Sequence, residues 1–286
     1  MGVLDGKVAL VTGAARAQGR AHAETLARNG ADLVICDIAQ DITGIPYRLG
    51  TPAELKETAA LVESHGRRAV SLAADVRSQE QLDAVVAAGI EEFGRIDILV
   101  ANAGVFHLKP VWEITEQEWA AVVETNLGGV WRAAKAVLPH MIEQGGGSIV
   151  MISSTNGLEP GDGYAHYTAA KHGVIGLMGS VALEGAPFNV RCNAVCPGFV
   201  KSGMTSFQAQ LDKYAGHPGG TMADLEHAGL SFHPFKSLTY LDPQRIADAA
   251  LWLVSPASEA VTGVALPVDA GHLLVAGRVD RGSNRW

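Results

Sequence analysis

The chain has 286 residues, of which 48% are hydrophobic, and it carries a formal net charge of −8. This length fits one large α/β domain, and an acidic balance without Lys/Arg runs argues against nucleic acid or an anionic membrane as a partner. No stretch approaches the roughly 18 uninterrupted apolar residues of a membrane helix, and the start lacks the basic region and apolar core of a signal peptide.

Seven short apolar runs alternate with helical patterns along the chain. They are predicted to be strands buried on both faces, as a parallel sheet requires, at 7–13, 31–37, 68–75, 96–104, 147–154, 189–198 and 263–271. Capping boxes at Thr51–Glu54, Ser78–Gln81 and Thr115–Glu118 mark helix starts, and Asp242–Pro243 places Pro at a first helical position. The alternation predicts a single-domain, doubly wound Rossmann fold over 1–286, with a seven-stranded parallel sheet flanked by helices.

Two connections are longer than the roughly 2–6 residues that suffice between a strand and a helix. One runs over 38–51, between the second strand and the next helix. The other spans about 199–241 and is aromatic and His-bearing. It follows the carboxyl end of the sixth strand, where such sheets bind ligands, so we expect a substrate lid there.

The sequence TGAARAQG, residues 12–19, follows the first strand and opens the first helix. Its amides and the helix dipole can receive a pyrophosphate, with Gly13 permitting the turn and Gly19 close packing of the helix. Alone, the loop is equally compatible with a glycine turn that binds nothing. Asp37 favours the binding alternative, because a carboxylate at the end of the second strand can accept hydrogen bonds from both adenosine ribose hydroxyls, although alone it could also cap a helix.

The charge of Asp37 also favours NAD over NADP. A 2′-phosphate about 4 Å from a carboxylate would be repelled by about 4 kcal/mol per charge pair at an effective dielectric near 20. Arg16 in the glycine loop favours the opposite choice, because it could pair with that phosphate. We give Asp37 more weight, since an Arg can turn into solvent or lie along the pyrophosphate, and we expect NAD as the cofactor.

Two further strand ends lie at the predicted ligand edge. Asp75-Val76 ends the third strand and is expected to hold the adenine, while Asn102-Ala103-Gly104 ends the fourth and is expected to shape the floor under the cofactor. Asp75 could instead only cap a loop. For Asn102, tying neighbouring strands by side-chain hydrogen bonds is as good an explanation as direct contact.

Hydride transfer from a secondary alcohol needs a base for the hydroxyl proton and a donor that holds the oxygen as it becomes a carbonyl. Tyr167 can be that base, and Lys171, one helical turn away in YTAAK, is expected to lower the pKa of the phenol. Ser154 should hydrogen-bond the reacting oxygen, and its spacing to Tyr167 favours it over Ser153. Tyr164 is a rival phenol, but no Lys stands at the fourth position after it.

Taken in order, these residues resemble the short-chain dehydrogenase/reductase family over essentially the whole chain. The series also contains Asn126 and Pro197-Gly198. Asn126 is expected to bind a water that passes the proton outward, or alternatively to form a helix kink with a satisfied amide. The family also implies that Lys171 holds the nicotinamide ribose and that the protein is a homotetramer. Ala17 departs from the family pattern, which usually has its middle glycine there.

The 38–51 loop, the following helix at 51–68 and the ending VTGVALPVDAG resemble the mycofactocin-associated, carveol dehydrogenase-like branch of that family. This resemblance implies that NAD is buried under the 38–51 loop and recycled in place by the mycofactocin system.

After the sixth strand, Pro197 and its neighbours should cover the nicotinamide, with the Val200 backbone and the Ser202 hydroxyl binding the carboxamide; a simple proline turn is the alternative. The cofactor contacts expected from the sequence are Gly13, Arg16, Gln18, Gly19, Asp37, Ile38, Asp75, Val76, Asn102, Ala103, Gly104, Tyr167, Lys171, Pro197, Val200 and Ser202.

The three cysteines and ten histidines give no sign of a disulfide or a metal site. Cys192 and Cys196 lie too far apart along a strand to bridge each other, so we expect a reducing, cytoplasmic location. The histidines are scattered, without zinc-ligand spacing. The substrate pocket is expected to include His107, Met204, Phe207 and Phe232, with lid or surface packing as the alternative for each, while core and subunit contacts are expected for Trp112, Trp119 and Trp131.

The sequence therefore predicts NAD-dependent oxidation of a hydrophobic secondary alcohol, cyclic or terpenoid, to its ketone. An NADPH-dependent ketone or oxoacyl-carrier reductase is the alternative within enzymes, and Asp37 and the acidic balance disfavour it. A non-catalytic dinucleotide sensor is a more distant alternative, which the intact Ser154, Tyr167 and Lys171 disfavour.

Overall fold

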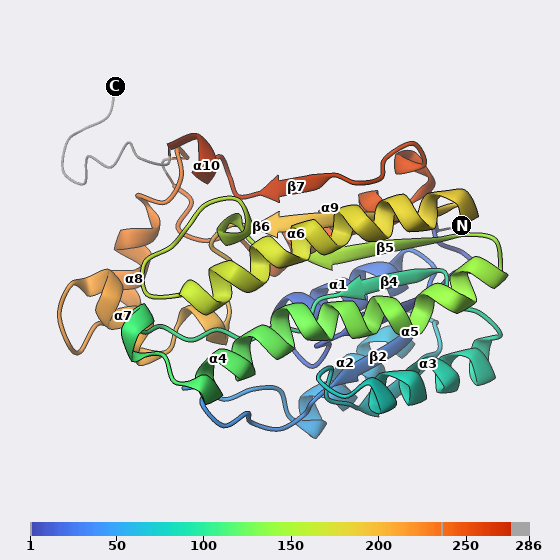
Figure 1. The fold of residues 1–286 in the computed structure, drawn as a ribbon, viewed down its shortest axis with the longest axis horizontal. Helices are drawn as coiled ribbons and strands as arrows, with labels where there is room; N and C mark the ends of the chain where they lie inside the picture. The colour runs from blue at the N-terminus through green and yellow to red at the C-terminus, as the bar shows by residue number, and fades with distance from the viewer. Residues whose placement is uncertain (1, 236, 276–286) are drawn as a thin grey trace.

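Seven parallel strands form one sheet in the order β3-β2-β1-β4-β5-β6-β7 (Figure 1). A computed structural model describes residues 2–235 and 237–275. Its strands are β1 (Val8–Thr12), β2 (Asp32–Asp37), β3 (Ala69–Ala73), β4 (Ile98–Ala101), β5 (Gly147–Ile152), β6 (Val190–Pro197) and β7 (Ala265–Val268). The order reverses between β1 and β4, the switch point at which such sheets bind ligands. The predicted doubly wound, seven-stranded sheet is confirmed.

Burial differs between the centre and the edges of the sheet. The central strands β1 and β4 are buried along their whole length. The prediction of burial on both faces is wrong for β3 and β7, which are only half-buried and expose Ser71, Ala73 and Pro267. These are the two edge strands, and each has a neighbour on one side only.

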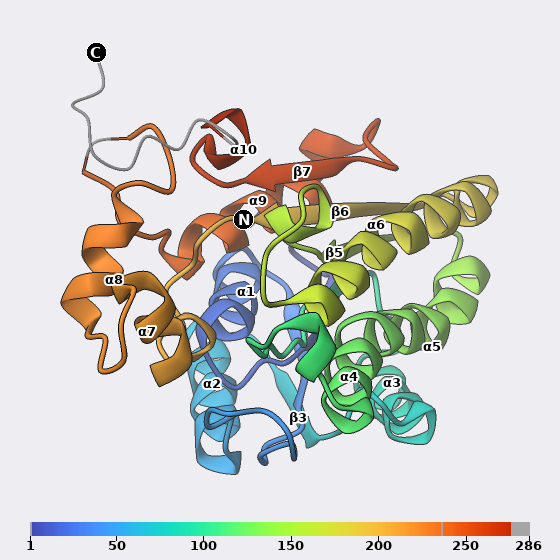
Figure 2. The same ribbon diagram turned by 60° about the vertical axis from the view of Figure 1, so that its left-hand side comes forward.

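Two layers of helices cover the sheet (Figure 2). One core contains residues of α3 (Gln79–Phe93), α5 (Gly129–Glu143) and α6 (Ala165–Gly185). The core on the other face contains residues of α1 (Ala17–Arg28), α2 (Pro52–Ser64) and α9 (Pro243–Val254). Shorter elements are α4 (Glu116–Val123), a π-helical turn (Glu124–Gly128), and 3-10 turns at Val111–Glu113, Thr155–Gly157, Ala186–Phe188, Gly203–Thr205 and Pro256–Ser258.

Most of the predicted helix starts are confirmed. Thr51 and Thr115 form reciprocal capping boxes, and the Asp242 side chain accepts a hydrogen bond from the Gln244 amide at the start of α9. Only one of the two hydrogen bonds of the capping box predicted at Ser78–Gln81 is present. Ser78 does accept from the Gln81 amide, but the Gln81 side chain accepts from the Asp75 amide at 2.8 Å instead of returning to Ser78.

The two long connections lie at the carboxyl ends of the strands. The 199–241 segment contains α7 (Gln208–Ala215) and α8 (Met222–Gly229), which extend beyond the strand ends in Figure 1. Its two ends are joined, because the Leu241 amide donates to the Phe199 carbonyl at 2.7 Å and the Lys201 amide donates to the Leu241 carbonyl at 3.0 Å. The 38–51 loop contains no helix or strand. The last described element is α10 (His272–Val275).

The three tryptophans between the fourth and fifth strands are not core residues. Trp112, Trp119 and Trp131 are 81%, 41% and 45% exposed, so the prediction of core packing is wrong, while their predicted role in subunit contacts stays a prediction. All three cysteines are free and buried. Within the described ranges no helix has the length and apolar character needed to cross a membrane.

Candidate active site

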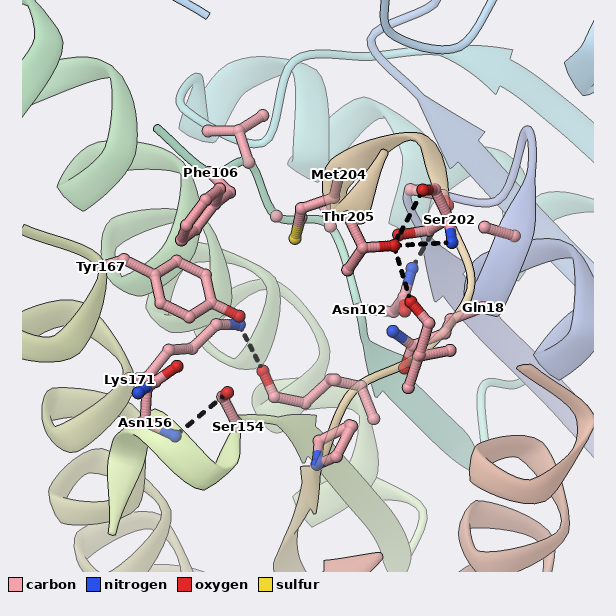
Figure 3. Close-up of a pocket in the computed structure, with 18 of the residues that line it drawn as sticks. Gln18, Asn102, Phe106, Ser154, Asn156, Tyr167, Lys171, Ser202, Met204 and Thr205 are labelled. Atoms are coloured by element: carbon pink, nitrogen blue, oxygen red, sulfur yellow. Dashed lines mark hydrogen bonds between the residues drawn. The ribbon is translucent and has the colours of Figure 1, made fainter. Parts of the chain in front are cut away.

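A cavity of about 530 Å³ opens at the switch point of the sheet, and every cofactor contact predicted from the sequence lines it. The lining also includes Ser154. Figure 3 shows Tyr167, Lys171 and Ser154 on one side of this pocket, with Ser202, Met204 and Thr205 across from them. The fold therefore brings together residues that are as far apart in the chain as the glycine loop and the lid.

The glycine loop is shaped by close backbone contacts. A Cβ on Gly13 would lie 2.7 Å from the Cα of Ala103, and one on Gly19 would lie 1.9 Å from the Gly13 carbonyl oxygen. Helix α1 then begins without a side-chain cap, so its first amides are available to an anion. The buried Oε1 of Gln18 has no hydrogen-bond partner among the described residues. A phosphate-bearing ligand would fit this unpaired helix start.

Asp37 is 8% exposed at the end of β2. Its two carboxylate oxygens accept from the amides of Ala15 at 3.1 Å and Ala39 at 3.0 Å. A carboxylate offers about four acceptor positions, so it can still accept from a ligand. Arg16, which the sequence left as a competing phosphate ligand, instead donates to the Arg48 carbonyl. This contact ties the glycine loop to the 38–51 loop.

The other two strand ends support their own loops. The Asp75 carboxylate pairs with the Arg77 guanidinium, with an Nη2–Oδ2 distance of 2.6 Å. The Asn102 side chain donates to the carbonyls of Thr12 at 3.0 Å and Gly13 at 3.2 Å. Asn102 thus ties β4 to β1, as the structural alternative predicted, and it also lines the cavity.

Ser154, Tyr167 and Lys171 form a buried cluster. Lys171 is 3% exposed, donates from Nζ to the Ile152 carbonyl at 2.7 Å and lies 5.5 Å from the centroid of the Tyr167 ring. Ser153 is directed elsewhere, because its hydroxyl donates to the Lys171 carbonyl at 2.8 Å. The rival phenol Tyr164 also has a cation over its ring, Lys213 at 4.4 Å. The sequence did not predict this second cation, because Lys213 belongs to the lid.

The ionisation of the cluster differs from the prediction. Burial raises the pKa of the Tyr167 phenol to about 12, although the Ser154 hydroxyl opposes the shift. Burial also lowers the pKa of the Lys171 ammonium to about 8. The net shift of the phenol pKa is therefore upward, opposite to the predicted lowering, because burial of the phenol is its largest cause.

Asn126 lies in the π-helical turn and is completely buried. Its Oδ1 accepts from the Val105 amide and its Nδ2 donates to the Val105 carbonyl, both at 2.7 Å. Asn126 does not line the cavity. This geometry matches the alternative of a helix distortion with a satisfied amide, and the water-binding role stays a prediction.

Two of the four predicted pocket residues, Met204 and Phe232, line the cavity, whereas His107 and Phe207 do not. His107 packs edge-on against the ring of His166, 6.0 Å away. Phe207 stacks on Tyr47 at 5.3 Å and so connects the lid to the 38–51 loop. Both predictions fail because the side chains pack elsewhere, His107 against helix α6 and Phe207 against the 38–51 loop.

Several lining residues were not predicted, among them Tyr47, Phe106, Glu159, Phe199, Gln210, Tyr214 and His272. His272 contacts the Phe232 carbonyl through Nδ1 and the Glu159 carboxylate through Nε2. These contacts connect α10, the 199–241 segment and the loop after Ser154. Helical spacing in the lid could have placed Gln210 and Tyr214 on one face.

The family model for short chain dehydrogenase matches residues 7–212. The chain belongs to the short-chain dehydrogenase family. A (-)-trans-carveol dehydrogenase of Rhodococcus erythropolis is 41% identical over 277 residues, which cover 96% of this chain and 100% of that protein. An uncharacterized NAD-dependent oxidoreductase of Mycobacterium tuberculosis is also 41% identical, over 274 residues that cover 95% and 98% of the two chains.

Solved structures agree with these relatives. The crystal structure of a carveol dehydrogenase from Mycobacterium avium in complex with NAD superposes with a TM-score of 0.93 at 42% identity, covering 96% of this chain and 100% of that one. The predicted family and its carveol dehydrogenase-like branch are confirmed.

In this short-chain dehydrogenase, Ala17 has a φ of +48°, the left-handed conformation that glycine adopts more readily. The departure from the family pattern thus leaves the backbone in the conformation that favours glycine.

Proposed function

We propose that this short-chain dehydrogenase oxidises a hydrophobic secondary alcohol, cyclic or terpenoid, to its ketone with NAD as the cofactor. The observation that carries the proposal is that one cavity holds Ser154, Tyr167, Lys171 and the whole set of predicted cofactor contacts. The relatives named for carveol dehydrogenase activity and for binding NAD support it.

The residues of the cavity fit a dinucleotide with an unphosphorylated ribose. The uncapped start of α1 and the unpaired Gln18 Oε1 fit the phosphate region, and Asp37 offers acceptors for ribose hydroxyls. NAD, when bound, supplies the hydride acceptor. The NADPH-dependent reductase is disfavoured, because Asp37 lines the cavity and Arg16 bonds the Arg48 carbonyl.

The protein's own residues handle the alcohol proton. Tyr167 takes this proton in oxidation and returns it in reduction, while Ser154 holds the oxygen. A phenol with a pKa of about 12 keeps its proton at neutral pH, so the active phenolate depends on added positive charge. Lys171, over the Tyr167 ring, supplies part of that charge. Asn126 contributes by holding the segment around Val105.

The 38–51 loop covers the bound cofactor in this proposal. Tyr47 supports it, because its hydroxyl accepts from the Phe106 amide at 2.9 Å while its ring stacks on Phe207. The loop is further closed by the Leu49 amide, which donates to Asp41 at 2.7 Å. We also propose, from the branch resemblance, that the enzyme is a cytoplasmic homotetramer whose NAD is reoxidised in place by the mycofactocin system.

A screen of cyclic and terpene alcohols, with NAD and in parallel with an artificial electron acceptor, tests the activity. Tyr167→Phe should lower kcat by about 10²- to 10⁴-fold, the usual contribution of a general acid–base. Tyr240→Phe is the control, because its hydroxyl bonds Glu226 outside the cavity. Unchanged turnover in Tyr167→Phe would contradict the assigned role.

The ultraviolet spectrum of the denatured protein tests cofactor burial. Purified protein should release NAD on denaturation and should respond weakly to free NAD. Protein that is free of cofactor and turns over readily with added NAD would contradict a buried, non-exchanging cofactor without affecting the proposed reaction.

A further inference from the structure

The lid helix α7 carries a polar pair into an otherwise aromatic part of the cavity. Gln210 and Tyr214 stand one turn apart and both line the cavity. The Gln210 Nε2 donates to the Tyr214 hydroxyl oxygen at 3.1 Å. Gln210 is only 4% exposed, and its Oε1 has no hydrogen-bond partner among the described residues. Neither residue belongs to the cofactor contacts or to the hydride-transfer cluster.

Within the described residues, Gln210 and Tyr214 each keep one hydrogen-bonding group without a partner. A phenol has one donor and can also accept, and the Gln210 amide uses the accepting side of Tyr214. The hydroxyl hydrogen of Tyr214 has no acceptor within the described ranges. Burial raises the pKa of this phenol, so the hydrogen is retained. A buried polar atom without a hydrogen-bond partner is unfavourable, so a ligand that pairs with the Gln210 Oε1 removes this cost.

The surroundings of Tyr214 place this pair at the substrate end of the cavity. Its ring contacts Phe199 at 5.6 Å and Phe232 at 5.3 Å, and Phe199 directly follows Pro197-Gly198 at the end of β6. At the reacting end, the Phe106 ring contacts Tyr167 at 5.1 Å and Tyr164 at 5.2 Å. Tyr214 is therefore held by the lid, whereas Tyr167 is held by α6.

Two other groups of polar side chains near this pair are hydrogen-bonded. Glu159 and His272 bond each other, and the second ring nitrogen of His272 donates to the Phe232 carbonyl. The Lys213 ammonium donates to Asp162 at 3.1 Å. Within the described residues, the Gln210 Oε1 is a buried acceptor without a partner, and the Tyr214 hydroxyl accepts from Gln210 without donating a hydrogen bond.

We propose that Gln210 and Tyr214 form a subsite for a second hydroxyl group of the substrate, remote from the carbinol that is oxidised. The inference rests on the proposed function, and it narrows the substrate class to cyclic or terpenoid secondary alcohols that carry another hydroxyl. The Tyr214 hydroxyl donates to the oxygen of that group, and the group donates in return to the Gln210 Oε1. A purely hydrocarbon substituent would leave both unpaired.

Two alcohols that differ by one oxygen test the subsite. They are para-isopropylcyclohexanol and its analogue with a tertiary hydroxyl on the isopropyl group, each assayed with NAD and with an artificial electron acceptor. The wild-type enzyme should prefer the hydroxylated alcohol by about tenfold in kcat/KM, as expected for a hydrogen bond at a buried site. Tyr214→Phe should abolish this preference by lowering kcat/KM about tenfold more for the hydroxylated alcohol than for the plain one.

Gln210→Met keeps the volume of the side chain and should also reduce the preference, while Tyr240→Phe, outside the cavity, should leave it intact. An unchanged preference in Tyr214→Phe, or an equal loss for both alcohols, would overturn the subsite. Oxidation of both alcohols by the wild-type enzyme without a preference would refute only the subsite. Oxidation of neither would refute the proposed function together with it.

Discussion

Replacing Ala17 with glycine should stabilise the protein, although glycine normally destabilises a folded chain. Ala17 has a φ of +48°, and the left-handed conformation costs an L-residue roughly 1–2 kcal/mol. Against this gain, the greater freedom of glycine in the unfolded chain costs about 0.4–1 kcal/mol. Loss of a half-buried methyl group removes a few tenths more. The net expectation is a rise of about 0.5 kcal/mol in the free energy of unfolding.

Urea denaturation of the cofactor-free enzyme at one protein concentration measures this change. Ala84→Gly is the matched control, because Ala84 is exposed in the middle of α3 and has no positive φ. The control should lose about 1 kcal/mol, the usual difference between glycine and alanine within a helix. The two variants should thus differ by about 1.5 kcal/mol. Equal destabilisation would refute the claim that Ala17 is strained. Ala17 also lines the cavity, so the same variant should bind NAD more tightly.

Three more predictions concern the site. Asp37→Asn should raise the NADPH to NADH ratio of kcat/KM by up to about 10³-fold, measured with one ketone, since it removes a repulsion of about 4 kcal/mol with a 2′-phosphate. Glu159→Gln should raise the KM for the alcohol about threefold with kcat nearly unchanged, because the ion pair between Glu159 and His272 holds the lid. Glu159→Ala should raise this KM further, and equal effects of the two substitutions would contradict this role. Lys171 has a folded pKa of about 8 against an ordinary 10.5, so the folded state binds fewer protons between these values and stability should rise with pH there. The unfolding free energy of the wild type minus that of Lys171→Met should increase by up to about 3 kcal/mol between pH 8 and pH 10.5. A difference that does not change with pH would contradict the lowered pKa of Lys171.

The architecture and the hydride-transfer cluster followed from local sequence. The strand and helix periodicities report which residues are buried, and the capping boxes at Thr51 and Thr115 are formed by residues three positions apart. The carboxyl ends of parallel strands meet at one edge, so Gly13, Asp37 and Asn102 could be assigned to one site before any coordinates. Spacing on one helix placed Lys171 beside Tyr167 in the same way.

Features of the site that depend on contacts between distant segments were decided by the tertiary structure alone. The pKa of Tyr167 depends on burial by several elements, and the direction of that effect was opposite to the one expected from Lys171 alone. Asn126 could be assigned to Val105, and His107 to His166, only once the loops were placed. The lid is the clearest case. Its sequence showed only that the segment is long and aromatic. The pair of Gln210 and Tyr214 faces the cavity because the ends of the lid are joined at Phe199 and Leu241, which folds α7 back over the strand ends. Contacts between residues so far apart leave no periodic pattern in the sequence.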